Sequence, residues 1–215
     1  MINKIKEKIN TFITHLEEEP EEEESKIILV DPGGHKNEPD MRVIGLFADV
    51  AEDKVAELVH AFLYLNELNN EEKNPKDKKP IEFYLSTYGG AADDMFALYD
   101  VMRQIQQTSE IHTIGVGKVM SAGVLLLAAG TKGKRKIGKH CRVMLHAAMA
   151  GSHGSLPNLV NEMEALQDLQ ESYIDALVEE TTMTKEDIKN MLERKVNVYL
   201  SSEEAVKFGI ADIII

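Results

Sequence analysis

GKVMSAGVLLLAAG, residues 117–130, places one serine, Ser121, between a strand-like segment and a long aliphatic run. The preceding residues have the apolar and β-branched composition of a strand, and the following ones are typical of a buried helix that Gly130 ends. Ser121 therefore lies at a predicted strand-to-helix junction. A serine at such a junction can cap the helix or act as a nucleophile, and this stretch alone does not decide between the two roles.

Strand and helix signals alternate along the rest of the chain in the same way. Strands are expected over residues 42–48, 81–87, 111–117, 142–147 and 196–201. Helices are expected over residues 52–68, 93–105, 156–180, 184–194 and 201–209. The longest helix carries an apolar face made of Leu159, Met163, Leu166, Leu169, Tyr173 and Leu177. Such alternation predicts an α/β fold with a largely parallel sheet, in which ligands gather where strand ends meet helix starts.

The composition limits the classes of function that are open to the chain. It has 215 residues, 43% of them hydrophobic and 28% charged, and a formal net charge of −13. That acidic charge disfavours nucleic-acid binding, which needs a basic surface. Cys141 is the one cysteine, so no internal disulfide is expected, and the histidines lack the spacing of a zinc site. Since no apolar run reaches the roughly 18 residues of a membrane span and no secretory signal core is found, we expect a cytoplasmic protein without metal, cofactor or membrane partner.

The N-terminus differs in composition from the rest of the chain. Residues 17–24 hold seven glutamates and one proline. Such a run repels itself and is usually solvated, so residues 1–25 are predicted to form a mobile acidic appendage. Residues 26–215 are predicted to form a single domain, in which the polar segments 31–40 and 69–80 are connectors. The basic segment KGKRKIGKH, residues 132–140, is expected to be an exposed turn.

The ends of predicted strands carry residues suited to catalysis. Gly89 and Gly90 follow the strand 81–87 and can present bare backbone N–H groups to a developing negative charge, or simply form a tight turn. His146 lies at the end of a later strand and is open to a role as general base or as a satisfied structural histidine. No phosphate-binding glycine motif is present, and the G-x-S-x-G motif is incomplete because Val119 stands at its first glycine.

Five motifs, taken in order, give the chain a resemblance to a known family. They are a glycine pair after a strand (YLSTYGGAADD), a serine followed by A-G, and the patterns A-A-G-x-K-G-x-R, R-V-M-L-H and S-x-E-E-A-x-x-x-G. From about residue 42 to its end, the chain resembles the proteolytic subunits of the Clp protease, a family of self-compartmentalised serine peptidases.

The resemblance implies a crotonase/ClpP-like α/β fold of repeated β-β-α units with a protruding handle helix. It implies a homo-oligomer of two stacked heptameric rings that cleaves unfolded polypeptides as a serine endopeptidase inside an enclosed chamber. An ATP-driven AAA+ unfoldase is the partner that usually feeds such a chamber.

The resemblance also assigns roles to individual residues. Ser121 matches the nucleophile, His146 the base and Asn197 the third catalytic position. Gly90 and Ala122 match the donors of the oxyanion hole, which is coherent because the base takes the serine proton while N–H groups hold the oxyanion. The handle matches the helix 156–180. The substrate peptide is expected to pair along a glycine-rich segment that contains Gly151, Ser152, His153 and Gly154.

The chain departs from the family pattern in its N-terminal segment, which in the family usually forms the axial gate that faces the unfoldase, and at three places further along the chain. Asn197 stands where the family has an aspartate, and Tyr88 replaces the proline before the glycine pair. Ala147 and Ala148 replace a Gln-Pro pair after the histidine. The departure at Asn197 affects the residue that would orient the catalytic imidazole.

Three alternatives therefore stay open beside the active serine endopeptidase. The first is a catalytically weak or inactive ClpP-like structural subunit, for which Asn197 is the argument. The second is a crotonase-type acyl-CoA enzyme, and the third is a serine–lysine peptidase that uses Lys118. The presence of both Ser121 and His146 favours the serine endopeptidase over all three.

Overall fold

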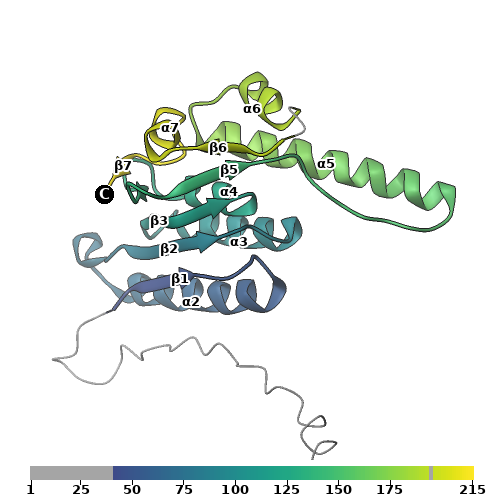
Figure 1. Cartoon of the computed structure of the whole chain (residues 1–215). Coiled ribbons are helices and arrows are strands. Elements are labelled where there is room, and N and C mark those ends of the chain that lie inside the picture. The colour runs from purple at the N-terminus through teal and green to yellow at the C-terminus, as the bar shows by residue number, and fades with distance from the viewer. Residues whose placement is uncertain (1–40, 194–195) are drawn as a thin grey trace, which may run out of the picture. The chain divides into compact units, whose positions relative to one another are not determined.

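The computed structural model describes residues 41–193 and 196–215 (Figure 1). The predictions for the appendage 1–25, its acidic run 17–24 and the connector 31–40 fall outside the described residues. Within the described residues, no helix is long and apolar enough to cross a membrane.

A seven-stranded sheet forms the centre of the described chain. Its strands are β1 (Val43–Leu46), β2 (Ile81–Thr87), β3 (Ile111–Met120), β4 (Lys136–Ile137), β5 (Arg142–Leu145), β6 (Val198–Leu200) and β7 (Ile213–Ile214). The path β1-β2-β3-β4-β7 is parallel throughout. The sheet forks at β3, whose middle pairs with β4 and whose last residues pair in parallel with β5, and β6 then adds antiparallel to β5.

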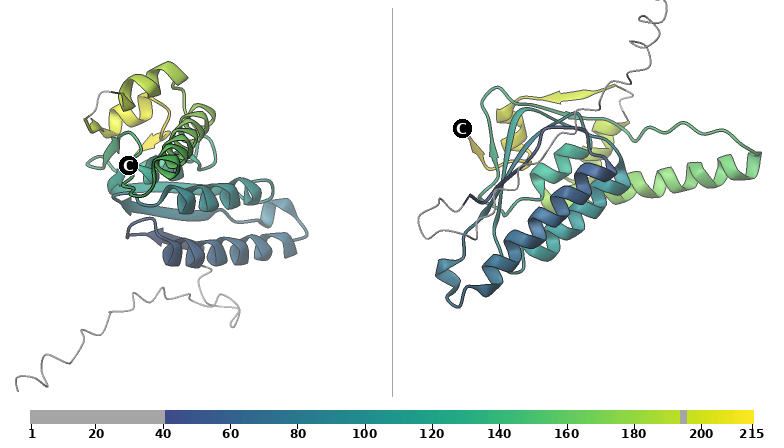
Figure 2. Two further views of the ribbon diagram at one scale, coloured as in Figure 1. Left: turned by 90° about the vertical axis from the view of Figure 1, so that its right-hand side faces the viewer. Right: turned by 90° about the horizontal axis from the view of Figure 1, so that it is seen from below.

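The described residues form six α-helices, some of which cover one face of the sheet (Figures 1 and 2). They are α2 (Glu52–Glu71), α3 (Ala92–Ile105), α4 (Ala122–Ala128), α5 (Leu156–Glu180), α6 (Lys185–Leu192) and α7 (Ser202–Lys207), with a short 3₁₀ helix η1 (Pro75–Asp77). Helices α2, α3 and α4 lie side by side on that face, whereas α5 extends past the sheet as the predicted handle. The predicted α/β class with a largely parallel sheet and a protruding helix is confirmed.

Helix α4 is buried along its whole length, as the aliphatic run predicts. The side chains of residues 124–127 have no exposed surface, and burying each one stabilises the fold by about 1.5–3 kcal/mol. Gly123 brings α4 close to β2, because a Cβ atom at this position would lie 2.5 Å from Cγ2 of Thr87. This tight packing fixes the chain directly after Ser121.

The basic segment 132–140 differs from its prediction as an exposed turn. It contains the strand β4, and Arg135 is only 4% exposed. Arg135 donates from Nη2 to Oδ1 of Asp212 (2.5 Å) and from Nε to Oδ2 (2.8 Å). The prediction holds for residues 132–134 and 139–140, which are exposed. It was wrong for Arg135, because a local run of cations gives no sign of a carboxylate that lies 77 residues further along the chain.

The connector predicted at 69–80 begins inside a helix. Helix α2 continues to Glu71, and Asn69 is fully buried near its end. The Asn69 side chain accepts a hydrogen bond from Nη1 of Arg42 (2.6 Å) and donates one to Oγ of Ser109 (2.8 Å). These bonds satisfy a polar side chain whose burial alone would cost free energy, so the helix extends into a segment of polar composition.

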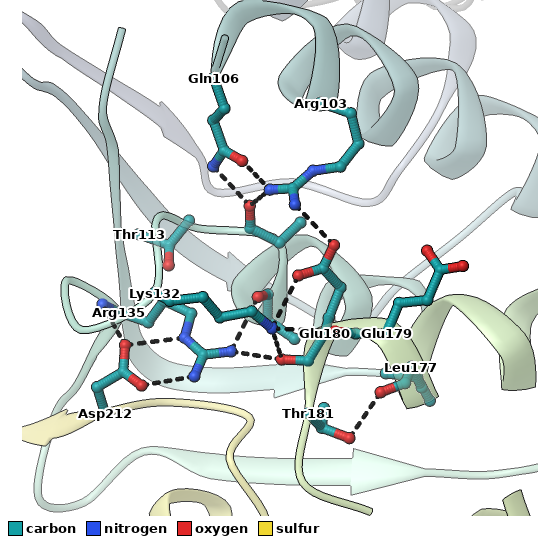
Figure 3. A network of polar contacts seen from close by, with 12 residues as sticks. Arg103, Gln106, Thr113, Lys132, Arg135, Leu177, Glu179, Glu180, Thr181 and Asp212 are labelled. Carbon is teal, nitrogen blue, oxygen red and sulfur yellow. Dashed lines mark hydrogen bonds and ion pairs between the residues drawn. The ribbon is translucent and has the colours of Figure 1, made fainter.

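Charged side chains hold the C-terminal end of α5 against the sheet (Figure 3). The buried Glu180 carboxylate accepts hydrogen bonds from Nη1 of Arg103 (2.8 Å) and from the hydroxyl of Tyr99 (3.0 Å). Its other oxygen lies 3.0 Å from Nζ of Lys132, and its backbone carbonyl accepts from Nη1 of Arg135 (2.6 Å). Burial and the Glu180 charge both raise the pKa of Tyr99, which keeps this hydroxyl a donor. We call these five residues and Asp212, the partner of Arg135, the anchor cluster.

Candidate active site

Three adjacent strands end beside one cleft. Strands β2, β3 and β5 are parallel neighbours, so their carboxyl ends lie at the same edge of the sheet. The cleft has a volume of about 510 Å³. It brings together four of the predicted site residues, namely Gly90, Ser121, Ala122 and His146.

Ser121 has a strained backbone. Its φ of 53° and ψ of −121° make it the one non-glycine residue with positive φ in the described chain. Such a conformation costs about 1–3 kcal/mol and persists only where the surroundings hold it. The Ser121 N–H donates to the carbonyl of Met144 (2.8 Å), and its carbonyl accepts from the hydroxyl of Tyr173 (3.0 Å). The Ser121 side chain makes no capping hydrogen bond to α4, so the structure does not support the reading of Ser121 as a helix cap.

The glycine pair lies against Ser121. Gly89 has a φ of 103°, and a Cβ atom there would lie 2.6 Å from Cβ of Ser121. A Cβ atom on Gly90 would lie 2.1 Å from the carbonyl oxygen of Val50. Both positions therefore require glycine. Among the described residues, no hydrogen bond occupies the N–H groups of Gly90 and Ala122, so both are free to hold an oxyanion in the cleft.

His146 follows β5 and is half-buried. Its Nδ1 atom lies 2.6 Å from the carbonyl oxygen of Ala147. Since a carbonyl only accepts, a hydrogen bond here requires the proton on Nδ1, and a neutral ring in this tautomer has its lone pair on Nε2. His146 and Ser121 line the same cleft without a direct hydrogen bond in the described structure, and such catalytic bonds often tighten only when substrate binds.

The structure places the other predicted site residues outside the cleft lining. Asn197 is exposed and lies one residue before β6. The β5–β6 register pairs Leu145 with Val198, which sets the Asn197 backbone level with His146, but no hydrogen bond joins the two side chains within the described chain. The segment that contains Gly151, Ser152, His153 and Gly154 is exposed and has no strand structure. The roles of these residues stay predictions.

Other residues complete the cleft without having been assigned to it from the sequence. Five of them are large apolar or aromatic side chains of α3, α5 and the loop after β5: Met95, Met149, Leu166, Leu169 and Tyr173. The helical periodicity had identified three of them as one face of α5, but not that this face reaches the site. Gln170 also lines the cleft, and nothing in the sequence distinguishes it from other polar residues of α5.

Lys118 does not line the cleft. Its Nζ atom lies 4.4 Å from the centre of the Tyr88 ring, in a cation–π contact at the end of β2. The alternative of a serine–lysine peptidase therefore gains no support from the structure.

Metal-binding and thiol chemistry gain no support either. Within residues 41–193 and 196–215, no three His, Cys, Asp or Glu side chains come together as a metal site. Cys141 is buried, and burial raises the pKa of its thiol to about 11. A thiol with such a pKa is a poor nucleophile near neutral pH.

A strained serine, a histidine and two free N–H groups in one cleft define the class of serine hydrolases. The sequence profile of the Clp protease family matches residues 35–215. The chain belongs to the Clp protease family.

Curated relatives agree with this assignment. The chain is 33% identical over 174 residues to the ATP-dependent Clp protease proteolytic subunit 1 of Prochlorococcus marinus subsp. pastoris, covering 81% of this chain and 83% of that protein. It is 32% identical over 174 residues to the ATP-dependent Clp protease proteolytic subunit of Deinococcus radiodurans, covering 81% and 80%. The resemblance drawn from the five motifs and the prediction of a serine-type peptidase are thereby confirmed.

Proposed function

We propose that this chain is a serine endopeptidase that cleaves unfolded polypeptides inside an oligomeric chamber, with Ser121 as nucleophile and His146 as base. The observation that carries the proposal is the strained Ser121, held beside two free N–H groups in the cleft that His146 also lines. Strain of this kind has to be held by the surroundings, and a site that exposes a nucleophile is where proteins tolerate it.

The proposed reaction uses four groups of the chain. Oγ of Ser121 attacks the scissile carbonyl while its proton passes to Nε2 of His146. The oxyanion accepts hydrogen bonds from the N–H groups of Gly90 and Ala122, which are worth about 2.7–4 kcal/mol per donor in a comparable site. His146 then gives the proton to the leaving amine, which leaves an acyl-enzyme on Ser121. In the second half of the reaction His146 takes a proton from the attacking water and returns it to Oγ of Ser121, which is released together with the carboxylic acid product.

Assembly is part of the proposal, because a chamber requires closed rings. The exposed apolar residues of α5 support it: Leu156 is 75% and Met163 64% exposed. Leu159, Leu166 and Leu169 are half-buried already within the subunit. We propose two stacked heptameric rings in the cytoplasm, with an AAA+ unfoldase as partner, since the relatives are named as subunits of an ATP-dependent protease.

Hydrolysis of small fluorogenic peptides tests the catalytic proposal. We expect Ser121→Ala and His146→Ala to lose activity, because general base catalysis alone contributes about 10²–10⁴-fold. Asn197→Asp is expected to be at least as fast as wild type, since a carboxylate there would add charge stabilisation to the imidazolium. Equal background rates for wild type and Ser121→Ala on several peptides would contradict the assignment.

A catalytically weak or inactive subunit is the second candidate. Its argument comes from the sequence, which has Asn197 at the position that the resemblance gives to the third catalytic residue, while the names of the relatives do not favour it. A serine hydrolase that loses this carboxylate retains little activity when the imidazole is left in the wrong tautomer. The two candidates differ in one result: assembled particles of an inactive subunit would show no hydrolysis that depends on Ser121.

A further inference from the structure

One peptide group links His146 to helix α5. The carbonyl oxygen of Ala147 accepts from Nδ1 of His146 (2.6 Å). The N–H of the same peptide, which belongs to Ala148, donates to Oε1 of Gln170 (3.0 Å). The peptide is therefore held at both of its polar atoms, on one side by the candidate base and on the other by a side chain of α5.

Few other contacts can fix this peptide. The described segment from Ala147 to Gly154 has no regular secondary structure and no further hydrogen bond. Gln170 is half-buried, lines the cleft and lies on a helix whose C-terminal end is buried. It is thus the side chain that joins this loop to a rigid element, and rigid supports are what keep a catalytic group in place.

We propose that Gln170 is a positioning residue for His146, acting through the Ala147–Ala148 peptide. This inference rests on the proposed function, in which His146 is the base. A carbonyl acceptor fixes Nδ1–H and leaves the lone pair on Nε2, which is the form that can take the Ser121 proton. After that transfer the ring carries both N–H groups, and the Ala147 carbonyl still accepts from Nδ1.

The same bond changes the part played by Asn197. Nδ1 has a single proton, so the Ala147 carbonyl and the Asn197 side chain are alternative acceptors, and the structure holds the first of them. The carbonyl supplies the tautomer without a carboxylate, although it lacks the negative charge that would stabilise an imidazolium further. By holding the Ala147–Ala148 peptide, Gln170 thus helps to fix the tautomer of His146, which is one of the two roles of the aspartate that this chain lacks.

The test compares Gln170→Leu, which removes the acceptor, with Gln170→Glu, which keeps an oxygen and adds a charge. Losing one neutral hydrogen bond should lower kcat for peptide hydrolysis about 3- to 10-fold in Gln170→Leu with little change in KM. The acidic limb of kcat/KM should move to lower pH in Gln170→Leu and to higher pH in Gln170→Glu, because the imidazolium is stabilised less in the first and more in the second. The other titratable groups that line the cleft, Asp49, Tyr88, Asp93 and Tyr173, are unchanged in both variants.

Gln167→Leu is the matched control, since Gln167 is exposed on the same helix and its side chain makes no hydrogen bond within the described chain. We expect its kcat and pH profile to equal those of wild type, with the particle mass checked for every variant. Should Gln170→Leu fail to assemble, the upward shift of the limb in Gln170→Glu still tests the proposal. A Gln170→Leu particle with wild-type kcat and an unmoved limb would overturn the inference and leave the proposed function intact.

Solid-state ¹⁵N spectra of histidine-labelled particles, with His146→Asn to assign the signal, give a readout that does not need activity. Wild type should show the Nδ1–H form of His146, and Gln170→Leu should shift it toward the Nε2–H form. An Nε2–H form in wild type would overturn the inference. Absence of Ser121-dependent hydrolysis together with the expected tautomer would instead reject the proposed function and support the positioning role.

Discussion

The two ends of helix α5 have opposite surroundings. Towards its C-terminus, Ile174, Leu177 and Glu180 expose 2% of their surface or less, and the anchor cluster ties this end to α3 and to the segment before β4. Towards its N-terminus, Leu156 and Met163 are largely exposed. The apolar residues of this helix are thus covered at its C-terminal end and exposed at its N-terminal end within the described chain, which supports a second subunit as the partner of the exposed residues.

The residues that support the candidate site lie between these two ends. Tyr173 donates to the carbonyl of Ser121, and Gln170 accepts from the N–H of Ala148. Burial raises the pKa of the Tyr173 hydroxyl, so it stays protonated and keeps donating. The anchored end therefore fixes the side chains that hold the proposed nucleophile and the proposed base, while the exposed end is available for the proposed assembly.

The largest effect on stability is expected from breaking the anchored end. Glu180→Ala removes the buried carboxylate that accepts from Arg103 and Tyr99. Since the side chains of Arg103 and Lys132 are 34% and 53% exposed and can be hydrated, we expect the loss of a charged hydrogen bond, about 1.5–3 kcal/mol, rather than the full cost of breaking a buried ion pair. Chemical denaturation at a fixed subunit concentration measures the free energy of unfolding. Glu179→Ala is the control, because that neighbouring side chain is exposed. Equal unfolding midpoints for the two variants would show that the anchor cluster does not hold α5.

Charges on the free end should separate assembly from folding. Val160→Glu combined with Met163→Glu places two carboxylates on exposed apolar positions. We expect this variant to lose the large particle while the free energy of unfolding of the subunit changes by about 0.5 kcal/mol or less. Light scattering at micromolar concentration measures the mass. Asn161→Glu, on the opposite face of the helix, should keep the wild-type mass, and a monomeric wild type would contradict the assembly proposal.

The smallest effect is expected from the edge of the anchor cluster and depends on pH. Partial burial works to raise the pKa of Asp212, but the Arg135 guanidinium outweighs it, so this pKa lies below its ordinary value. A lowered folded-state pKa contributes stability above the unfolded value, near pH 4, and that contribution is lost as the pH falls through the folded value. Asp212→Asn should therefore be less stable than wild type at pH 7, and the gap between their unfolding midpoints should close below about pH 4. A gap that is constant from pH 7 to pH 3 would show that the ion pair with Arg135 is not its source.

Local patterns predicted the parts of this structure that local physics determines. The bounds of α5 and the buried run after Ser121 follow from helical spacing and from a stretch of aliphatic residues. Arg135 was predicted to be exposed, because its partner Asp212 becomes a neighbour only in the folded sheet. Gln170 could not be recognised for the same reason: the N–H that it accepts from belongs to a loop 22 residues earlier.

The candidate site shows the same division between local and long-range information. The motifs predicted four site residues, Gly90, Ser121, Ala122 and His146, and in the structure all four line one cleft. The strain at Ser121 depends on contacts with β5 and α5, which no local pattern contains.

Labelling with a fluorophosphonate probe tests most directly whether this cleft activates Ser121. Mass spectrometry of the full-length particle should find one phosphonylated residue, Ser121, in wild type and none in Ser121→Ala. His146→Ala should be labelled at least about 100-fold more slowly, because the probe needs the same base as the substrate. Labelling of wild type that is no faster than that of Ser121→Ala, or that falls on a different serine, would contradict the assignment of Ser121 as the nucleophile.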